Sequence, residues 1–203
     1  MKLYEFEPFP NPRRVRMFIA EKMLDVERIQ INVPKGEHRQ PAFTEKNPAA
    51  TVPCLELDDG TMIGECVAIS RYLEATHPEP ALMGKTPKEK ALVDMWQARV
   101  QNELFDACTT YFHHATPGLG ELEPFQNKDW GLQAKERAEK TILWLDEELE
   151  HRAYIAGDTF SIADITALCG IDFAGFCEIN IPDECTNLKR WYDDVSSRPS
   201  AAA

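Results

Sequence analysis

The sequence lacks a long apolar run. Nowhere in its 203 residues do about 18 consecutive apolar residues occur, as a membrane-spanning helix requires. The first residues, MKLYEFEPF, also lack the positively charged start and apolar stretch of a secretory signal peptide. We therefore expect a cytoplasmic protein that does not enter membranes.

Positive charge is scarce. The chain has 22 Lys and Arg against 34 Asp and Glu, so its formal net charge is −12. Binding to the phosphate backbone of a nucleic acid needs clustered Lys and Arg, so the composition argues against such a partner. The best local basic cluster is formed by Arg13, Arg14 and Arg16.

The sequence has no cysteine motif for metal or redox chemistry. None of the six cysteines forms a C-x-x-C pair or has zinc-site spacing with histidine, so we expect no metal. A chain of this size without a secretion signal does not need disulfides, and most of its cysteines are interpreted as buried small apolar residues. The cysteines are Cys54, Cys66, Cys108, Cys169, Cys177 and Cys185.

Residues 1–77 alternate strand and helix patterns. Their order, β-α-β-α-β-β-α, predicts an α/β domain with two parallel strands joined by a helix, then a hairpin and a closing helix. The hairpin is indicated by two strand-like runs around the turn DDG at 58–60. The expected strands are 3–6, 26–33, 52–57 and 61–65, and the expected helices are 13–23, 41–47 and 66–76.

A second domain follows a linker. Prolines and a glycine interrupt the pattern, and we place the linker at 78–86. Strand patterns nearly vanish beyond it, which predicts an all-helical domain over 87–203. Ser161 and Asp164 have the spacing of a capping box, which stabilises the start of a helix by about 1 kcal/mol and does not indicate a function. The expected helices are 87–114, 129–151, 160–176 and 183–199.

Several segments together resemble the cytosolic glutathione transferases. The segments are NPAATVPCLELDDGTMIGECVAISRYLEATHP (47–78), FSIADITA (160–167), WYDDVSSRPS (191–200) and NPRRVRMFIAEKM (11–23). They resemble, in turn, the family's glutathione-binding half, its buried capping motif, the end of its last helix and its first helix. The resemblance spans essentially the whole chain. It implies a thioredoxin-like first domain, a helical second domain and a homodimer.

The resemblance also implies where glutathione binds. The Val52–Pro53 peptide bond would be cis, and the Val52 backbone would pair with the cysteinyl part of glutathione. From the residues alone, an ordinary trans bond at the start of the strand is the alternative. Glu65 would hold the ammonium group, and the helix beginning at Cys66 would bind the γ-glutamyl carboxylate. The family usually has Ser at this position. Cys66 is therefore either a packing and weak capping residue or a reactive thiol.

Three further residues are implied in glutathione binding. His38 and Arg39 lie before the short helix at 41–47, where relatives use polar or basic side chains on the glycyl carboxylate. A solvated charged loop is the alternative for these two residues. Thr51 stands where some relatives have a Lys that helps to bind the peptide.

The loop FEPFPNPRR (6–14) is where we expect the residue that activates the thiol of glutathione. This thiol resembles that of a free cysteine, with a pKa of about 8.5. A transferase must lower this pKa, and it can do so with a hydrogen-bond donor and a helix N-terminus. Where many relatives carry a Ser, Tyr or Cys, this chain has Phe9. The loop PFPN (8–11) is similar to the Thr-Pro-Asn loop of bacterial disulfide-reductase-like members, without the Thr. Asn11 is the predicted catalytic thiol contact; its alternative role is to cap a helix whose first residue is Pro12.

The second substrate would be a hydrophobic electrophile or a disulfide. Phe9, Phe105 and Phe112 are the candidates to line its pocket, although helical spacing also explains Phe105 and Phe112 as core residues.

The favoured function is therefore glutathione transfer to electrophilic small molecules, in detoxification. Glutathione-dependent reduction of disulfides or peroxides is the second enzymatic interpretation. A non-catalytic binding or regulatory module is the third, and Phe9 in place of a hydroxyl residue is the feature in its favour.

Overall fold

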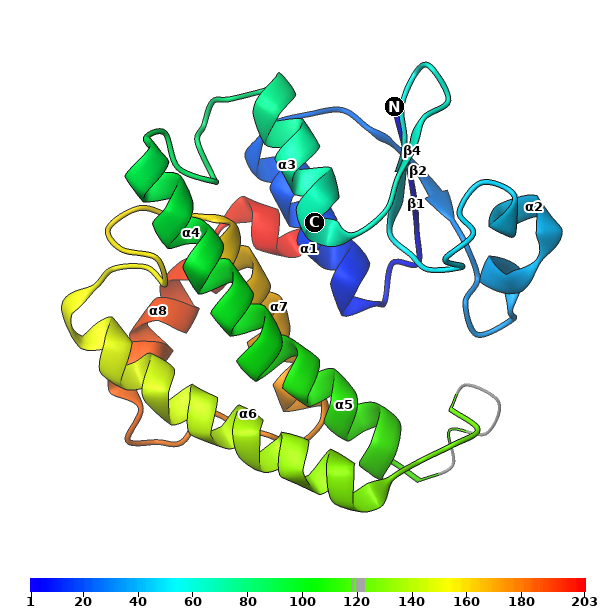
Figure 1. The fold of residues 1–203 in the computed structure, drawn as a ribbon. Helices are drawn as coiled ribbons and strands as arrows, with labels where there is room; N and C mark the ends of the chain where they lie inside the picture. The colour runs from blue at the N-terminus through cyan, green and yellow to red at the C-terminus, as the bar shows by residue number, and fades with distance from the viewer. Residues whose placement is uncertain (118, 120–122) are drawn as a thin grey trace. The chain divides into compact units, whose positions relative to one another are not determined.

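The computed structural model describes residues 1–117, 119 and 123–203. The chain divides into two units, Met1–Ala81 with Ala202–Ala203, and Leu82–Ala201. The first unit is α/β and the second is helical, which confirms the predicted fold class. Figure 1 labels most of their strands and helices.

The first unit is built on a four-stranded sheet in the order β2-β1-β3-β4. β1 is parallel to β2 and antiparallel to β3, and β3 and β4 form an antiparallel hairpin. This is the predicted thioredoxin-like arrangement. The strands are β1 (Lys2–Glu5), β2 (Glu27–Gln30), β3 (Cys54–Glu56) and β4 (Met62–Ile63), and the helices are α1 (Pro10–Glu21), α2 (Pro41–Thr44) and α3 (Cys66–Thr76).

Apolar side chains are buried on both faces of this sheet. Successive residues of a strand point to opposite faces, so Leu3 and Tyr4 serve different clusters. Tyr4 and Cys54 pack with Phe43 of α2 on one side. On the other side, α1 and α3 pack against each other. The fully buried apolar residues of this unit are Leu3, Val15, Met17, Phe18, Leu55, Ile69 and Leu73.

Two buried charge clusters fix α1 in place. The Glu5 carboxylate is fully buried and lies 2.6 Å from Nη1 of Arg16 and 2.5 Å from Nε of Arg28. Nζ of Lys22 lies 2.5 Å from a Glu74 carboxylate oxygen. A buried charge is costly unless it is paired, so these contacts hold α1 firmly to β1, β2 and α3.

The second unit consists of helices that surround α7. α4 packs on α7, and α5 lies along α6. A π-helical segment, Gln101–Phe105, joins α4 to α5, and Oγ1 of Thr141 donates a 3.1 Å hydrogen bond to the Glu103 carbonyl oxygen there. The helices are α4 (Pro87–Val100), α5 (Asp106–Ala115), α6 (Lys128–Glu148), α7 (Ile162–Phe176) and α8 (Thr186–Ser196).

The predicted capping box at Ser161 is confirmed. Its side chain accepts from the backbone of the first turn, and the Asp164 carboxylate accepts from the Ser161 N–H at 2.9 Å. Asp164 also accepts from the Ile155 N–H and from Nε1 of Trp191. Burial raises the pKa of Asp164 to about 6, although these hydrogen bonds favour its charged form. The network joins the start of α7 to α8.

The structure corrects the bounds of the first helix. α1 begins at Pro10 rather than residue 13, because prolines are tolerated in a first turn whose N–H groups have no helical acceptor. It ends at Glu21, and Met23 takes a left-handed φ of 53°. Met23 falls inside the helix predicted over 13–23, but it lies beyond the true end and is 84% exposed.

Candidate active site

The loop between β1 and α1 delivers Asn11 into the first turn of a helix. The N-cap position is held by Phe9, whose carbonyl oxygen accepts a bond from the Arg13 N–H at 3.3 Å, and Pro10 is the first helical residue. The alternative role of Asn11 as the helix cap is therefore wrong, as is the placement of Pro12 at the first helical position. Asn11 instead presents its side chain from inside the first turn.

This loop is anchored from both sides. Nη2 of Arg16 donates to the Glu7 carbonyl oxygen at 2.9 Å, while Nη1 of the same residue binds Glu5. The Phe6 and Phe9 rings meet edge to face, with centroids 5.0 Å apart. The backbone that leads to Asn11 is thus held by a buried guanidinium and an aromatic pair.

The start of α3 meets the start of α1. Sγ of Cys66 lies 3.4 Å from the backbone oxygen of Asn11 and 3.7 Å from its side-chain Oδ1. Glu65 holds the N-cap position of α3, with an exposed side chain and φ 62°, ψ 123°. Such a backbone is unfavourable for a residue other than glycine, by about 1–3 kcal/mol, and such residues cluster at functional sites. Cys66 is the first helical residue, so its weak capping role is wrong and its packing role fits the geometry.

The Val52–Pro53 peptide bond is cis, as the resemblance implies. In the described part of the chain, neither the N–H nor the C=O of Val52 takes part in a hydrogen bond, which leaves both groups for a ligand. The loop before it is held by Asn47, whose side chain is buried. Its Nδ2 donates to the Thr51 carbonyl oxygen at 2.8 Å, and its Oδ1 accepts from the Ala49 N–H at 3.3 Å.

The three further residues that the resemblance implies in glutathione binding lie in different settings. His38 and Arg39 form a 3₁₀ turn, Glu37–Arg39, in which His38 is buried and Arg39 exposed. Burial, and then the Arg39 charge, lower the pKa of His38, which favours the neutral form of its ring. Among the described residues, its buried Nδ1 has no hydrogen-bond partner. The Thr51 side chain is exposed.

The candidates for the second-substrate pocket separate by burial. Phe105 is 1% exposed and stacks on Phe173, with centroids 6.5 Å apart, so its core role fits the structure better. Phe112 is half-buried and contacts both Phe173 and Phe176, and Phe176 is 71% exposed. Phe9, in the first unit, is half-buried.

Sequence reasoning assigned no role to several of these side chains. Phe173 and Phe176 were not singled out, although their i, i+3 spacing near the end of a helix predicts a shared face. The hydrogen bonds of Asn47 depend on how its loop folds back, and no sequence spacing reveals them.

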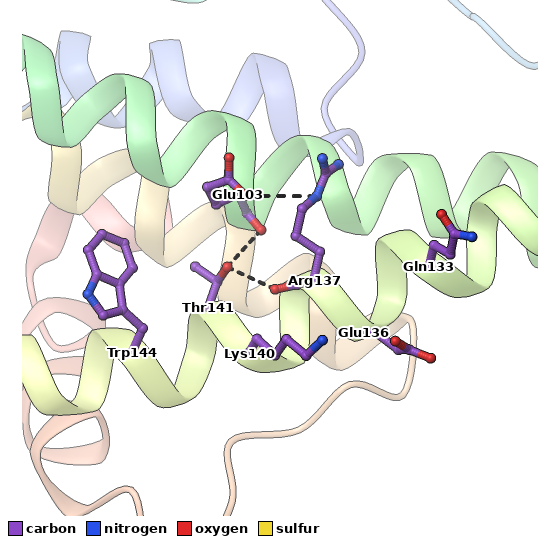
Figure 2. A pocket seen from close by; sticks show the side chains of 7 residues that line it. All are labelled: Glu103, Gln133, Glu136, Arg137, Lys140, Thr141 and Trp144. Atoms are coloured by element: carbon purple, nitrogen blue, oxygen red, sulfur yellow. Dashed lines mark hydrogen bonds and ion pairs between the residues drawn. The ribbon is translucent and has the colours of Figure 1, made fainter.

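A hollow of about 400 Å³ lies in the second unit (Figure 2). Its lining carries charges of both signs and one indole ring, and Nε of Arg137 lies 4.0 Å from a Glu103 carboxylate oxygen. None of the predicted site residues lines it. The lining residues are Glu103, Gln133, Glu136, Arg137, Lys140, Thr141 and Trp144.

Within the described residues, no group of three or more His, Cys, Asp or Glu side chains is arranged to hold a metal ion. Within the same part of the chain, no helix is long and apolar enough to cross a membrane.

Both domains match known families. The family described as "Glutathione S-transferase, N-terminal domain" matches residues 10–76, and "Glutathione S-transferase, C-terminal domain" matches residues 100–199. Together with the fold, these matches confirm the resemblance: the chain belongs to the glutathione S-transferase family.

Individual relatives are similar over nearly the full chain. Glutathione S-transferase 2 of Saccharomyces cerevisiae is 47% identical over 203 residues, covering 98% of this chain and 87% of that protein. The crystal structure of Gtt2 from Saccharomyces cerevisiae has a TM-score of 0.95 at 46% identity, covering 100% of this chain and 99% of that one. A glutathione S-transferase domain-containing protein of Marinobacter aquaeolei also reaches 0.95, at 47% identity, covering 98% and 99%.

Proposed function

We propose that this protein binds glutathione in its first unit and transfers the thiolate to an electrophilic carbon of a hydrophobic small molecule. The observation that carries the proposal is the meeting of two helix N-termini at Asn11 and Cys66. The dipoles of the two helices create positive potential there, and such potential stabilises both a carboxylate and a thiolate. Family membership supports the same chemistry.

Glutathione would be held along its whole length. The N–H and C=O of Val52, beside the cis bond to Pro53, suit the backbone of the cysteinyl residue. The exposed Glu65 carboxylate suits the ammonium group, and the first turn of α3 suits the γ-glutamyl carboxylate. At the other end, Arg39 supplies charge for the glycyl carboxylate, and the buried ring of His38 supplies a hydrogen-bonding nitrogen.

Activation of the thiol is assigned to Asn11. Its amide N–H can donate to sulfur and favours the thiolate over the thiol, which lowers the thiol pKa. Tyr4 offers no alternative donor, because its hydroxyl is bonded to Glu56 at 2.5 Å. The positive end of α1 adds to the effect.

The acceptor molecule is expected to be aromatic or otherwise hydrophobic. Phe112 and Phe176 form a partly exposed aromatic surface in the second unit. Aromatic rings favour planar apolar ligands through edge-to-face and offset-stacked contacts.

The test is product analysis with glutathione and an aryl halide, run beside reduction of a mixed disulfide. We expect the conjugate as the main product, and Asn11→Ala should lower turnover by about a hundredfold while changing glutathione affinity little. Equal turnover in that variant would remove Asn11 from the mechanism. Disulfide reduction without conjugation would favour the reductase interpretation, which the absence of a hydroxyl at Phe9 supports. If the protein catalyses neither reaction, the result would favour a non-catalytic module.

We further propose a homodimer in the cytoplasm with a role in detoxification. The hollow in Figure 2 carries Arg137 and Lys140 beside Glu103 and Glu136, and charges of both signs on one face suit pairing with a copy turned about a twofold axis. Sedimentation of the wild-type chain should give twice the monomer mass. The double variant Arg137→Glu/Lys140→Glu should sediment as a monomer, and a monomeric wild-type chain would contradict the proposal.

A further inference from the structure

Arg14 lies one helical turn after Asn11, with its side chain almost completely buried. Its Nη1 is 3.0 Å from Oδ1 of Asn11, a hydrogen bond between residues three apart on the same helix. Arg14 is 5% exposed, which is rare for a charged side chain unless it is paired. The contact joins a buried charge to the residue that the proposed function assigns to the thiol.

The chemistry of the two groups fixes the orientation of the amide. A guanidinium group has only donors, so the Asn11 atom that faces it must be the oxygen and not the NH₂ group. The usual ambiguity between the oxygen and nitrogen of an asparagine amide is thereby removed. The thiol of Cys66 also lies on the oxygen side, 3.7 Å from Oδ1.

The NH₂ group of Asn11 is consequently the end of the amide that is left for a ligand. In the described part of the chain, Nδ2 has no hydrogen-bond partner. A hydrogen bond from a charged donor to the amide oxygen also polarises the amide, which strengthens its N–H groups as donors. A donor held in place before the reaction stabilises developing negative charge without the cost of reorganisation.

We infer that Arg14 is a positioning residue for thiol activation. It holds Asn11 by its oxygen, so that the N–H groups are presented to the sulfur of glutathione. The inference rests on the proposed function, and it assigns to Arg14 an effect exerted through Asn11 and not a direct contact with the substrate.

The experiment measures the pKa of the bound thiol from the ultraviolet absorbance of the thiolate as a function of pH. Arg14→Met should raise that pKa by about one unit and lower turnover near neutral pH about tenfold. Arg14→Lys, which keeps a buried charge and a donor, should lie between Arg14→Met and the wild type. Arg71→Met removes an exposed arginine from the same unit and should leave the thiol pKa unchanged.

A double-mutant cycle separates positioning from simple electrostatics. If Arg14 acts through Asn11, Arg14→Met should have no further effect on the thiol pKa in an Asn11→Ala background. An equal effect in both backgrounds would overturn the inference, because it would show a direct action of the charge. An unchanged pKa in Arg14→Met, or in Arg14→Lys if the Met variant does not fold, would also overturn it. Absence of a thiolate signal in the wild-type protein would instead refute the proposed function itself.

Discussion

Sγ of Cys66 lies 3.4 Å from the backbone oxygen of Asn11, so a thiol hydrogen bond joins the first turns of α3 and α1. A thiolate has no hydrogen to donate, and it would be repelled by the same oxygen. The geometry therefore supports a structural role for Cys66 and weakens the hypothesis of a reactive thiol. The thiol is also buried, which limits access to it.

Replacement of Cys66 tests this role. Cys66→Ser keeps a donor and should retain conjugating activity within about fivefold, the equivalent of roughly 1 kcal/mol. Cys66→Val keeps the volume without a donor and should lose more activity. Steady-state kinetics with glutathione and an aryl halide give both values. A Ser variant that conjugates normally but no longer reduces disulfides or peroxides would restore the reactive interpretation.

The backbone conformation of Glu65 predicts that two variants with the same loss of glutathione binding differ in stability. Glu65→Ala and Glu65→Gly both remove the carboxylate, and both should weaken glutathione binding about tenfold or more. Only glycine relieves the left-handed φ of 62°, so the Gly variant should be more stable than the Ala variant by about 1 kcal/mol. Urea unfolding measures the difference. Equal stability of the two variants would mean that this backbone costs the fold nothing.

Asn47 is expected to act on the binding of glutathione through the loop that it holds. Asn47→Ala removes the bond to the Thr51 carbonyl oxygen and should raise KM for glutathione about tenfold while changing kcat little. Asn102→Ala, an exposed asparagine in the second unit, is the matched control. A fall in kcat with an unchanged KM would show that the loop serves the chemical step instead.

The pairing of Tyr4 and Lys46 with Glu56 should make stability depend on pH. The hydrogen bond from Tyr4, and then that from Lys46, lower the pKa of Glu56 below its ordinary 4.5. A lowered carboxyl pKa stabilises the fold above the unfolded-state value, and this stabilisation is lost as pH falls through the folded-state value. Glu56→Gln should therefore be less stable than the wild type at pH 7, with the difference shrinking below pH 4.5.

The midpoints of urea unfolding of Glu56→Gln and the wild type, measured at pH 7 and below pH 4.5, check this expectation. Glu45→Gln, at an exposed position in the same unit, should change the midpoint little at either pH. A Glu56→Gln difference that stays constant across the range would show that the carboxylate charge does not matter there.

Local patterns in the sequence predicted the fold well. The helix predicted over 66–76 coincides with α3, because its apolar spacing and the strand before it are local signals. The start of α1 was predicted too late in the chain, because PFPN (8–11) was interpreted as a loop, whereas Pro10 and Pro12 fit the first turn of the helix. The single helix predicted over 87–114 contains a π-helical segment that depends on packing.

The site was predicted less completely. The cis bond at Val52–Pro53 followed from the family resemblance and not from the residues, which alone favour trans. The pair of Asn11 and Arg14 has i, i+3 spacing and was accessible to sequence reasoning once both were placed on one helix. The contact between Cys66 and Asn11 joins residues 55 positions apart, and only the folded sheet and helices bring them together.

The most direct test of the account is calorimetric titration of the protein with reduced glutathione at pH 7. We predict saturable binding at one site per chain, strongly weakened in Glu65→Ala and little changed in Asn11→Ala. The same titration with glutathione disulfide shows whether the site prefers the reductase substrate. No binding of either form to the wild-type protein would contradict the account, because the fold would then be present without its glutathione site.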